Sequence, residues 1–117
     1  MIGIGIDAVD VERFARVLQR RPSMAGRLFT DHEQQVGSGA AGLAARFAAK
    51  EAVMKALGVG LGAFAFRDVE VVKQESGAPE LHVTGAAAEL AEQRGVQSWK
   101  VSLTHTAALA EAVVVAE

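Results

Sequence analysis

The stretch 43-LAARFAAKEAVMKALG-58 decides the fold of this 117-residue chain. Half of it is alanine and leucine, which have high helix propensity. Gly58 follows its last apolar residue, at the position where a glycine commonly ends a helix. The stretch therefore predicts a long helix over residues 43–57, around which the rest of the chain is expected to pack.

Segments on both sides of this helix alternate in hydropathy with a period of two, which is typical of strands. In residues 1–7 isoleucines alternate with glycines, which predicts a strand that has one buried face and ends at Asp7. The other predicted strands are DVEVVK (68–73), ELHVT (80–84), SWKVSLT (98–104) and ALAEAVVVA (108–116). The first two of these four are expected to form a hairpin across the ESGAP turn, and the last two to meet near His105.

Further helices are predicted over residues 10–21, where Asp10 is a suitable N-cap, and over residues 86–94. The segment between the predicted helices 10–21 and 43–57 is expected to hold a helical turn within residues 27–36 and a mobile glycine-rich loop over residues 37–42. This mixture of helices and hairpins predicts an α+β fold with a single domain over residues 1–117.

Composition excludes several classes of protein. The absence of cysteine excludes a disulfide framework and a cysteine-ligated zinc site, and it favours a reducing compartment. With 50% apolar residues the chain is not disordered, and self-association is plausible. The net charge of −2 argues against general nucleic-acid binding.

No export or membrane segment is expected. The opening MIGIGID lacks the basic region of a signal peptide. The charge-free stretches 34–45 and 56–66 are shorter than the ~20 apolar residues that a spanning helix needs. A cytoplasmic protein is therefore expected. The dinucleotide pattern in GIGIDA (3–8) is interpreted as part of a strand, because its glycines lie inside the strand and not between a strand and a helix.

Asp7 and Glu51 are the candidate catalytic acids. Asp7 stands where a strand gives way to a helix, from which a carboxylate commonly points into a cleft; a capping or turn aspartate is the alternative. Glu51 and Lys55 are four residues apart on an otherwise apolar helix face. They could form a solvated ion pair, but a carboxylate among alanines is partly desolvated, an environment that metal or proton chemistry uses.

Arg46 and Lys50 form a second pair of charges further round the same helix. With Lys55 they give the helix three cations beside one acid, which suits phosphate groups and one divalent ion.

The histidines carry less information. His105, flanked by two threonines, could bind phosphate, shuttle a proton or cap its turn. His32 and His82 lack partners at metal-ligand spacing and are interpreted as surface residues. Trp99 is expected in the core.

In order and approximate spacing, the whole chain resembles the holo-acyl-carrier-protein synthases, a small bacterial group of 4′-phosphopantetheinyl transferases. The resemblance lies in IGIGIDAVDVERF (2–14), RLFTDHE (27–33), RFAAKEAVMKALG (46–58), GAP (77–79) and SLTHT (102–106). Two departures are Val59, where the family often has threonine, and Met54, where it often has serine.

The resemblance implies the 4′-phosphopantetheinyl transferase fold and a reaction in fatty acid biosynthesis. In this reaction 4′-phosphopantetheine moves from coenzyme A to a serine of an apo acyl carrier protein or carrier domain, and adenosine 3′,5′-bisphosphate is released. Asp7 and Glu51 would hold Mg²⁺, and Glu51 would deprotonate the serine directly or through a metal-bound water. Lys55 would stabilise or protonate the leaving bisphosphate. The nucleotide would be lined by Arg46, Pro79, His105 and Thr106.

The resemblance also implies a docking surface and an assembly. Acidic carrier proteins would bind the arginine stripe, which consists of Arg13, Arg16, Arg20 and Arg27. A solvated helix face is the alternative, although such a face usually mixes charges of both signs. The chains would form homotrimers whose sites lie at subunit interfaces, with His105 contributed by a neighbour. The alternatives are a non-catalytic oligomeric module that binds acidic carrier proteins and a metal-dependent nucleotide hydrolase that uses the same acids.

Overall fold

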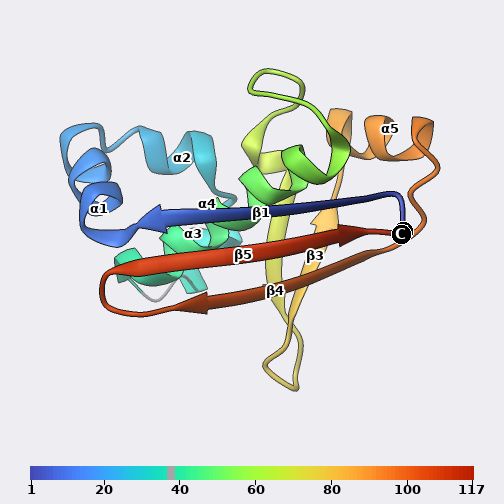
Figure 1. The fold of residues 1–117 in the computed structure, drawn as a ribbon. Helices are drawn as coiled ribbons and strands as arrows, with labels where there is room; N and C mark the ends of the chain where they lie inside the picture. The colour runs from blue at the N-terminus through green and yellow to red at the C-terminus, as the bar shows by residue number, and fades with distance from the viewer. Residues whose placement is uncertain (37–38) are drawn as a thin grey trace.

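The computed structural model describes residues 1–36 and 39–117. At its centre, helix α4 (Gly39–Leu57) lies against one face of a three-stranded sheet (Figure 1). The sheet has the order β1 (Gly3–Asp10), β5 (Leu109–Ala116), β4 (Trp99–His105), and neighbouring strands are antiparallel. The predicted α+β class, with a small antiparallel sheet packed on the long helix, is confirmed.

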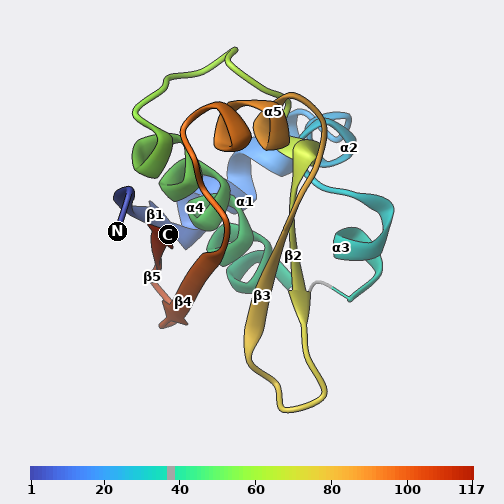
Figure 2. The same cartoon turned by 90° about the vertical axis from the view of Figure 1, so that its right-hand side faces the viewer.

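A second sheet is the hairpin of β2 (Val69–Lys73) and β3 (Pro79–Val83), as the sequence predicts. Strand β3 lies beside β4, and the hairpin tip extends away from the rest of the molecule (Figure 2). The short helix η1 (Phe66–Asp68) leads into β2, and α5 (Gly85–Gln93) follows β3 within one residue of its predicted limits.

Three helices connect β1 to α4: α1 (Val11–Arg20), α2 (Met24–Leu28) and α3 (Asp31–Val36). The predicted N-cap of α1 is confirmed, because the Asp10 carboxylate accepts a hydrogen bond from the Arg13 amide at 2.9 Å. The helical turn predicted within residues 27–36 is divided between α2 and α3.

Helix α4 begins four residues earlier than the sequence predicts, so the expected loop over residues 37–42 is wrong for residues 39–42. Ala40 and Ala41 pack against an apolar cluster that includes Ala44 and Ala45, and this packing offsets the low helix propensity of the nearby glycines. Residues 37 and 38 of the predicted loop lie outside the described part of the chain.

Strand β1 differs from its prediction in length. It continues through Asp7 to Asp10, because pairing with β5 extends to the Asp10–Leu109 pair. Asp7 therefore lies within a strand and not at its end.

The buried face of β1 is also the opposite of the one that hydropathy suggests. Gly3 and Gly5 face α4, while the Ile4 and Ile6 side chains on the other face are 57% and 64% exposed. A Cβ atom at residue 3 or 5 would lie 1.9 Å from a backbone carbonyl oxygen of α4. Only glycine allows this close approach, so the isoleucines point outward.

The core has two apolar clusters that meet on α4, one under the three-stranded sheet and one under α1 and α2. Trp99, predicted in the core, is half-buried at the edge of the first cluster. Within the described ranges, none of the helices combines the length and apolarity needed to cross a bilayer.

Candidate active site

The three residues proposed for catalysis come together where β1 crosses α4. The Asp7 carboxylate accepts a hydrogen bond from Lys55 Nζ at 3.2 Å, and Lys55 also donates to the Ile6 carbonyl oxygen at 2.8 Å. The Asp7 side chain is 19% exposed, whereas that of Lys55 is 53% exposed. The strand thus presents a shielded acid to a cation that solvent can reach.

Glu51 lies one helical turn before Lys55 and shares the same groove as Asp7. Desolvation raises the pKa of the Glu51 carboxyl above its ordinary value, the negative charge of Asp7 raises it further, and Lys55 lowers it. The partial desolvation expected for Glu51 from its alanine neighbours is confirmed. Two carboxylates that line one groove and a neighbouring ammonium group therefore interact electrostatically.

The donor set fits a hard divalent cation. Mg²⁺ takes one or two carboxylates and completes its shell with water and substrate phosphate oxygens, which Asp7 and Glu51 can satisfy. Burial is the main cause of the raised pKa of Glu51, and the negative charge of Asp7 adds to it; a cation bound by both acids would relieve this second effect. In residues 1–36 and 39–117 no group of three or more histidines, cysteines and acids is placed to bind a metal ion.

The groove that contains the two acids has a volume of about 760 Å³ and is largely apolar. Its aromatic wall is formed by Phe14, Phe47 and Phe66. The Phe47 ring lies 5.2 Å from that of Phe14 and 5.5 Å from that of Phe66, between ring centres. Arg13 of α1 also borders the groove, which brings the predicted arginine stripe next to the acids.

The other three arginines of the stripe are exposed. Arg16 forms an exposed ion pair with Glu12 at 3.6 Å, so the stripe is partly neutralised at that turn.

A second pocket, of about 200 Å³, lies on another side of α4 between that helix, the β2–β3 hairpin and β4. It brings together Arg46, Pro79 and His105, which the sequence assigns to the nucleotide. Arg46 is 5% exposed, and its Nη1 donates to the Gly42 carbonyl oxygen at 3.2 Å. Its Nε has no hydrogen-bond partner among the described residues, which leaves a buried donor beside the pocket.

Thr106 follows His105 but does not line this pocket. Its Oγ1 accepts hydrogen bonds from the amides of Ala108 and Leu109 at 3.2 and 3.0 Å, which fixes the β4–β5 turn. His32 and His82 are both exposed, as expected.

Sequence reasoning missed the one other charged residue of the described chain that lines the second pocket, and it misplaced one cation. Lys73 of β2 lines the second pocket, and its position on an alternating strand gave no signal for this role. Lys50, grouped with Arg46 and Lys55 as a cation facing phosphate, is fully buried and bound to Glu33, so that prediction is wrong. The local signal for Glu33 was Thr30 three residues before it, the spacing of a capping box.

The two pockets share no lining residue. One chain thus has an acidic groove and a separate smaller pocket on different sides of the same helix.

Comparison with known proteins identifies the family. Residues 3–113 match the family model described as the 4′-phosphopantetheinyl transferase superfamily. The chain belongs to this superfamily. The resemblance to the holo-acyl-carrier-protein synthases that the motifs indicate is confirmed by relatives with that name.

One such transferase is the holo-[acyl-carrier-protein] synthase of Streptomyces avermitilis, which is 51% identical over 121 aligned residues, covering 100% of this chain and 98% of the relative. The crystal structure of the enzyme from Neisseria meningitidis superposes with a TM-score of 0.90 at 35% identity, covering 100% of this chain and 98% of that one. The crystal structure of the Helicobacter pylori enzyme in complex with coenzyme A superposes with a TM-score of 0.88 at 32% identity, covering 97% of this chain and 99% of that one.

Proposed function

We propose that this chain transfers 4′-phosphopantetheine from coenzyme A to a serine hydroxyl of an apo acyl carrier protein, in a Mg²⁺-dependent reaction that releases adenosine 3′,5′-bisphosphate. The observation that carries this proposal is the partly desolvated Glu51 carboxylate, which lines an apolar groove together with Asp7, the partner of Lys55. The names of the relatives and the coenzyme A complex of one structural neighbour support the same reaction. A cytoplasmic role in fatty acid biosynthesis is part of this proposal.

The chain's own residues account for the proton transfers. Glu51, which lines the groove, removes the proton from the attacking serine. The serine oxygen forms a bond to the phosphorus that carries the pantetheine arm, and the bond from that phosphorus to the bridging oxygen breaks. Lys55, whose ammonium group is half-exposed beside Asp7, stabilises the negative charge on the departing bisphosphate.

Asp7 and Glu51 would hold the Mg²⁺ ion. When bound, the ion would neutralise charge on the pyrophosphate of coenzyme A. Asp7 in addition fixes Lys55 through their 3.2 Å contact, so its removal affects both the cation site and the leaving-group side.

The second pocket would bind the nucleotide half of coenzyme A. Its buried arginine, Arg46, has an unpaired Nε donor, and an anionic oxygen in the pocket would satisfy it. His105 and Pro79 border the same space, and Thr106 would contribute through the turn that it stabilises.

The acidic groove and the second pocket would be an acidic and a nucleotide half-site that are joined in a homotrimer. Within one chain they lie in separate pockets, so a complete site would combine the acidic half of one subunit with the nucleotide half of its neighbour. The outer face of the three-stranded sheet supports self-association, because the exposed Ile4 and Ile6 pair across strands with Val115 and Val113. An apolar sheet face of this kind is typically covered by another chain.

The carrier protein would dock on α1. Arg13 borders the groove, and Arg16, Arg20 and Arg27 extend its positive charge along α1 and α2. A carrier with an acidic helix would be steered to the groove by this charge, with its serine near Glu51.

Mass spectrometry of an apo carrier protein incubated with the chain, coenzyme A and Mg²⁺ tests the proposal. We expect the carrier mass to increase by one phosphopantetheine, and no increase with excess chelator or with Asp7→Asn or Glu51→Gln. Pantetheine phosphate released to water without carrier modification would support a nucleotide hydrolase, and carrier binding without either product would support a non-catalytic module.

A further inference from the structure

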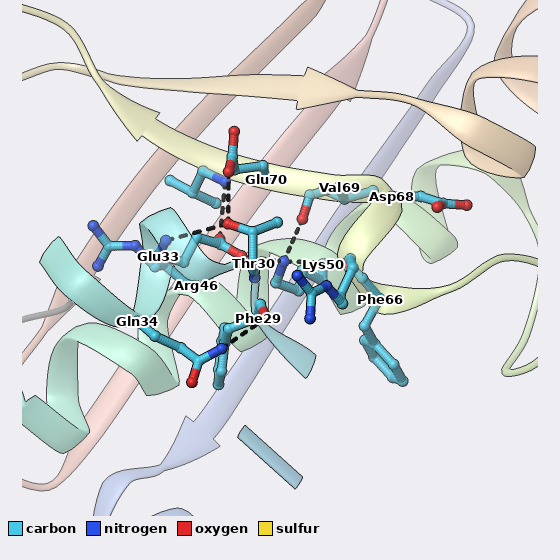
Figure 3. Close-up of polar contacts among 12 residues, drawn as sticks. Phe29, Thr30, Glu33, Gln34, Arg46, Lys50, Phe66, Asp68, Val69 and Glu70 are labelled. Atoms are coloured by element: carbon cyan, nitrogen blue, oxygen red, sulfur yellow. Dashed lines mark hydrogen bonds and ion pairs between the residues drawn. The ribbon is translucent and has the colours of Figure 1, made fainter. Parts of the chain in front are cut away.

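A buried polar cluster that the proposed chemistry does not use lies between α3, α4 and β2 (Figure 3). Glu33 and Lys50 are both fully buried, and Lys50 Nζ lies 2.8 Å from Glu33 Oε1. Burial lowers the pKa of Lys50, while Glu33 and Glu70 raise it. Removing two charges from water is unfavourable, and apolar residues of similar size often serve stability as well or better. The pair is therefore a candidate for a role other than stability.

The hydrogen bonds of the pair join α3 and α4 to the segment that leads into β2, further along the chain. Lys50 donates to the carbonyl oxygens of Phe66, at 3.1 Å, and of Val69. Glu33 Oε2 accepts from the Val71 amide at 3.0 Å, and its Oε1 accepts from the Thr30 amide at the same distance. The pair thus ties the middle of α4 and the start of α3 to the entry of the β2–β3 hairpin.

This hairpin supplies one wall of the second pocket, and α4 supplies another. Val71 connects the buried pair to the pocket, because its amide donates a hydrogen bond to Glu33 and the residue also lines the pocket. On α4, Arg46 lies four residues before Lys50 and therefore on the same face of the helix. Lys50 holds the hairpin base, while Arg46, one turn away, borders the pocket.

We propose that Glu33 and Lys50 are positioning residues for the nucleotide pocket: they hold the β2–β3 hairpin, with Lys73 and Pro79, at the separation from Arg46 that the nucleotide half of coenzyme A requires. The inference rests on the proposed function, since it assigns the nucleotide to this pocket. Neither residue contacts the ligand, and both act through the hairpin.

The test is binding of adenosine 3′,5′-bisphosphate to the full chain by calorimetry, together with transfer kinetics. Lys50→Met should weaken nucleotide binding and raise the KM for coenzyme A by about tenfold or more, while kcat at saturating coenzyme A changes by less than about threefold. The double variant Glu33→Met/Lys50→Met removes both charges and should regain thermal stability, because no buried charge is left unpaired. Its nucleotide affinity should remain low, since the bonds to Val69 and Val71 are absent.

Arg67→Met is the matched control. Arg67 forms an exposed ion pair with Asp31 at 3.5 Å that also links η1 to α3, but it does not line the pocket. This variant should keep wild-type nucleotide affinity. If Lys50→Met fails to fold, nucleotide binding is measured with the double variant and with Glu33→Gln instead. Glu33→Gln preserves side-chain size but removes one of the two acceptor oxygens.

Wild-type affinity in the folded double variant would overturn the positioning role and leave the pair a structural feature. Equal loss of affinity in Arg67→Met would overturn it as well, because general loosening of α3 would then explain the effect. A wild-type chain that binds no nucleotide would overturn the proposed function and with it this inference, so the two failures are distinguishable.

Discussion

Gly5 on β1 lies directly against the backbone carbonyl of Ala52 on α4, so that a Cβ atom at residue 5 would stand 1.9 Å from that oxygen. Gly3 has the same relation to Ala56 one turn further along the helix. Strand and helix therefore pack backbone against backbone. Asp7, two residues after Gly5 on the same face of the strand, is thereby brought within reach of Lys55.

Gly5→Ala should destabilise the fold by roughly 3 kcal/mol, because neither backbone can yield without separating β1 from α4. Gly26→Ala is the matched control, since nothing lies within 4 Å of its added Cβ and the residue is in helix α2. It should leave stability unchanged or raise it by about 0.5–1 kcal/mol. Chemical denaturation of both variants measures the difference, and equal stabilities would contradict backbone contact between β1 and α4.

The raised pKa of Glu51 predicts how its carboxyl group titrates in the metal-free chain. Burial and the negative charge of Asp7 should keep this carboxyl protonated to a higher pH than an ordinary glutamate, whose pKa is 4.5. Asp7→Asn should lower the pKa of Glu51, and Lys55→Met should raise it further, because the two neighbours shift it in opposite directions. Carbon-13 NMR of the carboxyl carbons measures both shifts without requiring activity. Unchanged values in both variants would contradict the electrostatic contact.

The same shift has a consequence for stability. Because the folded-state pKa of Glu51 lies above its unfolded-state value, this residue makes a favourable contribution to the free energy of unfolding at low pH. The contribution is lost as pH rises through the folded-state pKa. At neutral pH Glu51→Gln should therefore melt a few degrees higher than the wild type while losing at least about 100-fold in kcat/KM. The difference in Tm should disappear in acid, where the wild-type residue is protonated. A lower Tm at neutral pH would show that ionised Glu51 stabilises the fold.

Local sequence predicted the existence of the main elements but not which faces they bury. Alanine-rich composition and Gly58 were sufficient for α4, because helix propensity and the C-terminal glycine act within a few residues. For β1, hydropathy placed the isoleucines inside, whereas close packing on α4 requires glycine there. That requirement comes from a helix about 50 residues further along the chain, so no local pattern contained it.

In the candidate site, too, local spacing predicted which residues group together but not what each of them contacts. Glu51 and Lys55 could be grouped from their helical spacing alone, and the strand then added Asp7. Arg46 and Lys50 are both cations of α4 and both are buried, yet Arg46 borders a pocket and Lys50 forms an ion pair with Glu33. The difference is due to Glu33, which approaches Lys50 from α3, 17 residues earlier in the chain.

The arginine stripe predicts how carrier affinity depends on charge. Arg13→Glu or Arg20→Glu should raise the KM for the carrier protein by about tenfold at low salt and leave that for coenzyme A unchanged. Added salt should reproduce the effect in the wild type, since exposed charges are screened. Arg94→Glu, an exposed arginine at the end of α5 and so remote from α1, serves as the control (Figure 1). If Arg94→Glu has the same effect, the stripe provides only general positive charge.

The separation of the two pockets predicts complementation between inactive chains. Glu51→Ala destroys the acidic half-site and His105→Ala weakens the nucleotide half-site, so each homotrimer should have low activity. In trimers assembled from an equal mixture, a site is intact when its acidic half comes from a His105→Ala chain and its nucleotide half from a Glu51→Ala chain. Random assembly gives this pairing at about a quarter of the sites, so roughly a quarter of wild-type activity should return after joint refolding.

Asp7→Ala mixed with Glu51→Ala is the control for this experiment. Both changes lie in the acidic half-site, where Asp7 and Glu51 border the same groove, so every site in a mixed trimer contains a defective acidic half. No activity should return, although the chains assemble equally well. Restoration in this control would show exchange of whole sites and not of halves. Failure of the Glu51→Ala and His105→Ala mixture to regain activity, with mixed trimers confirmed by native mass spectrometry, would place both halves of the site in one chain.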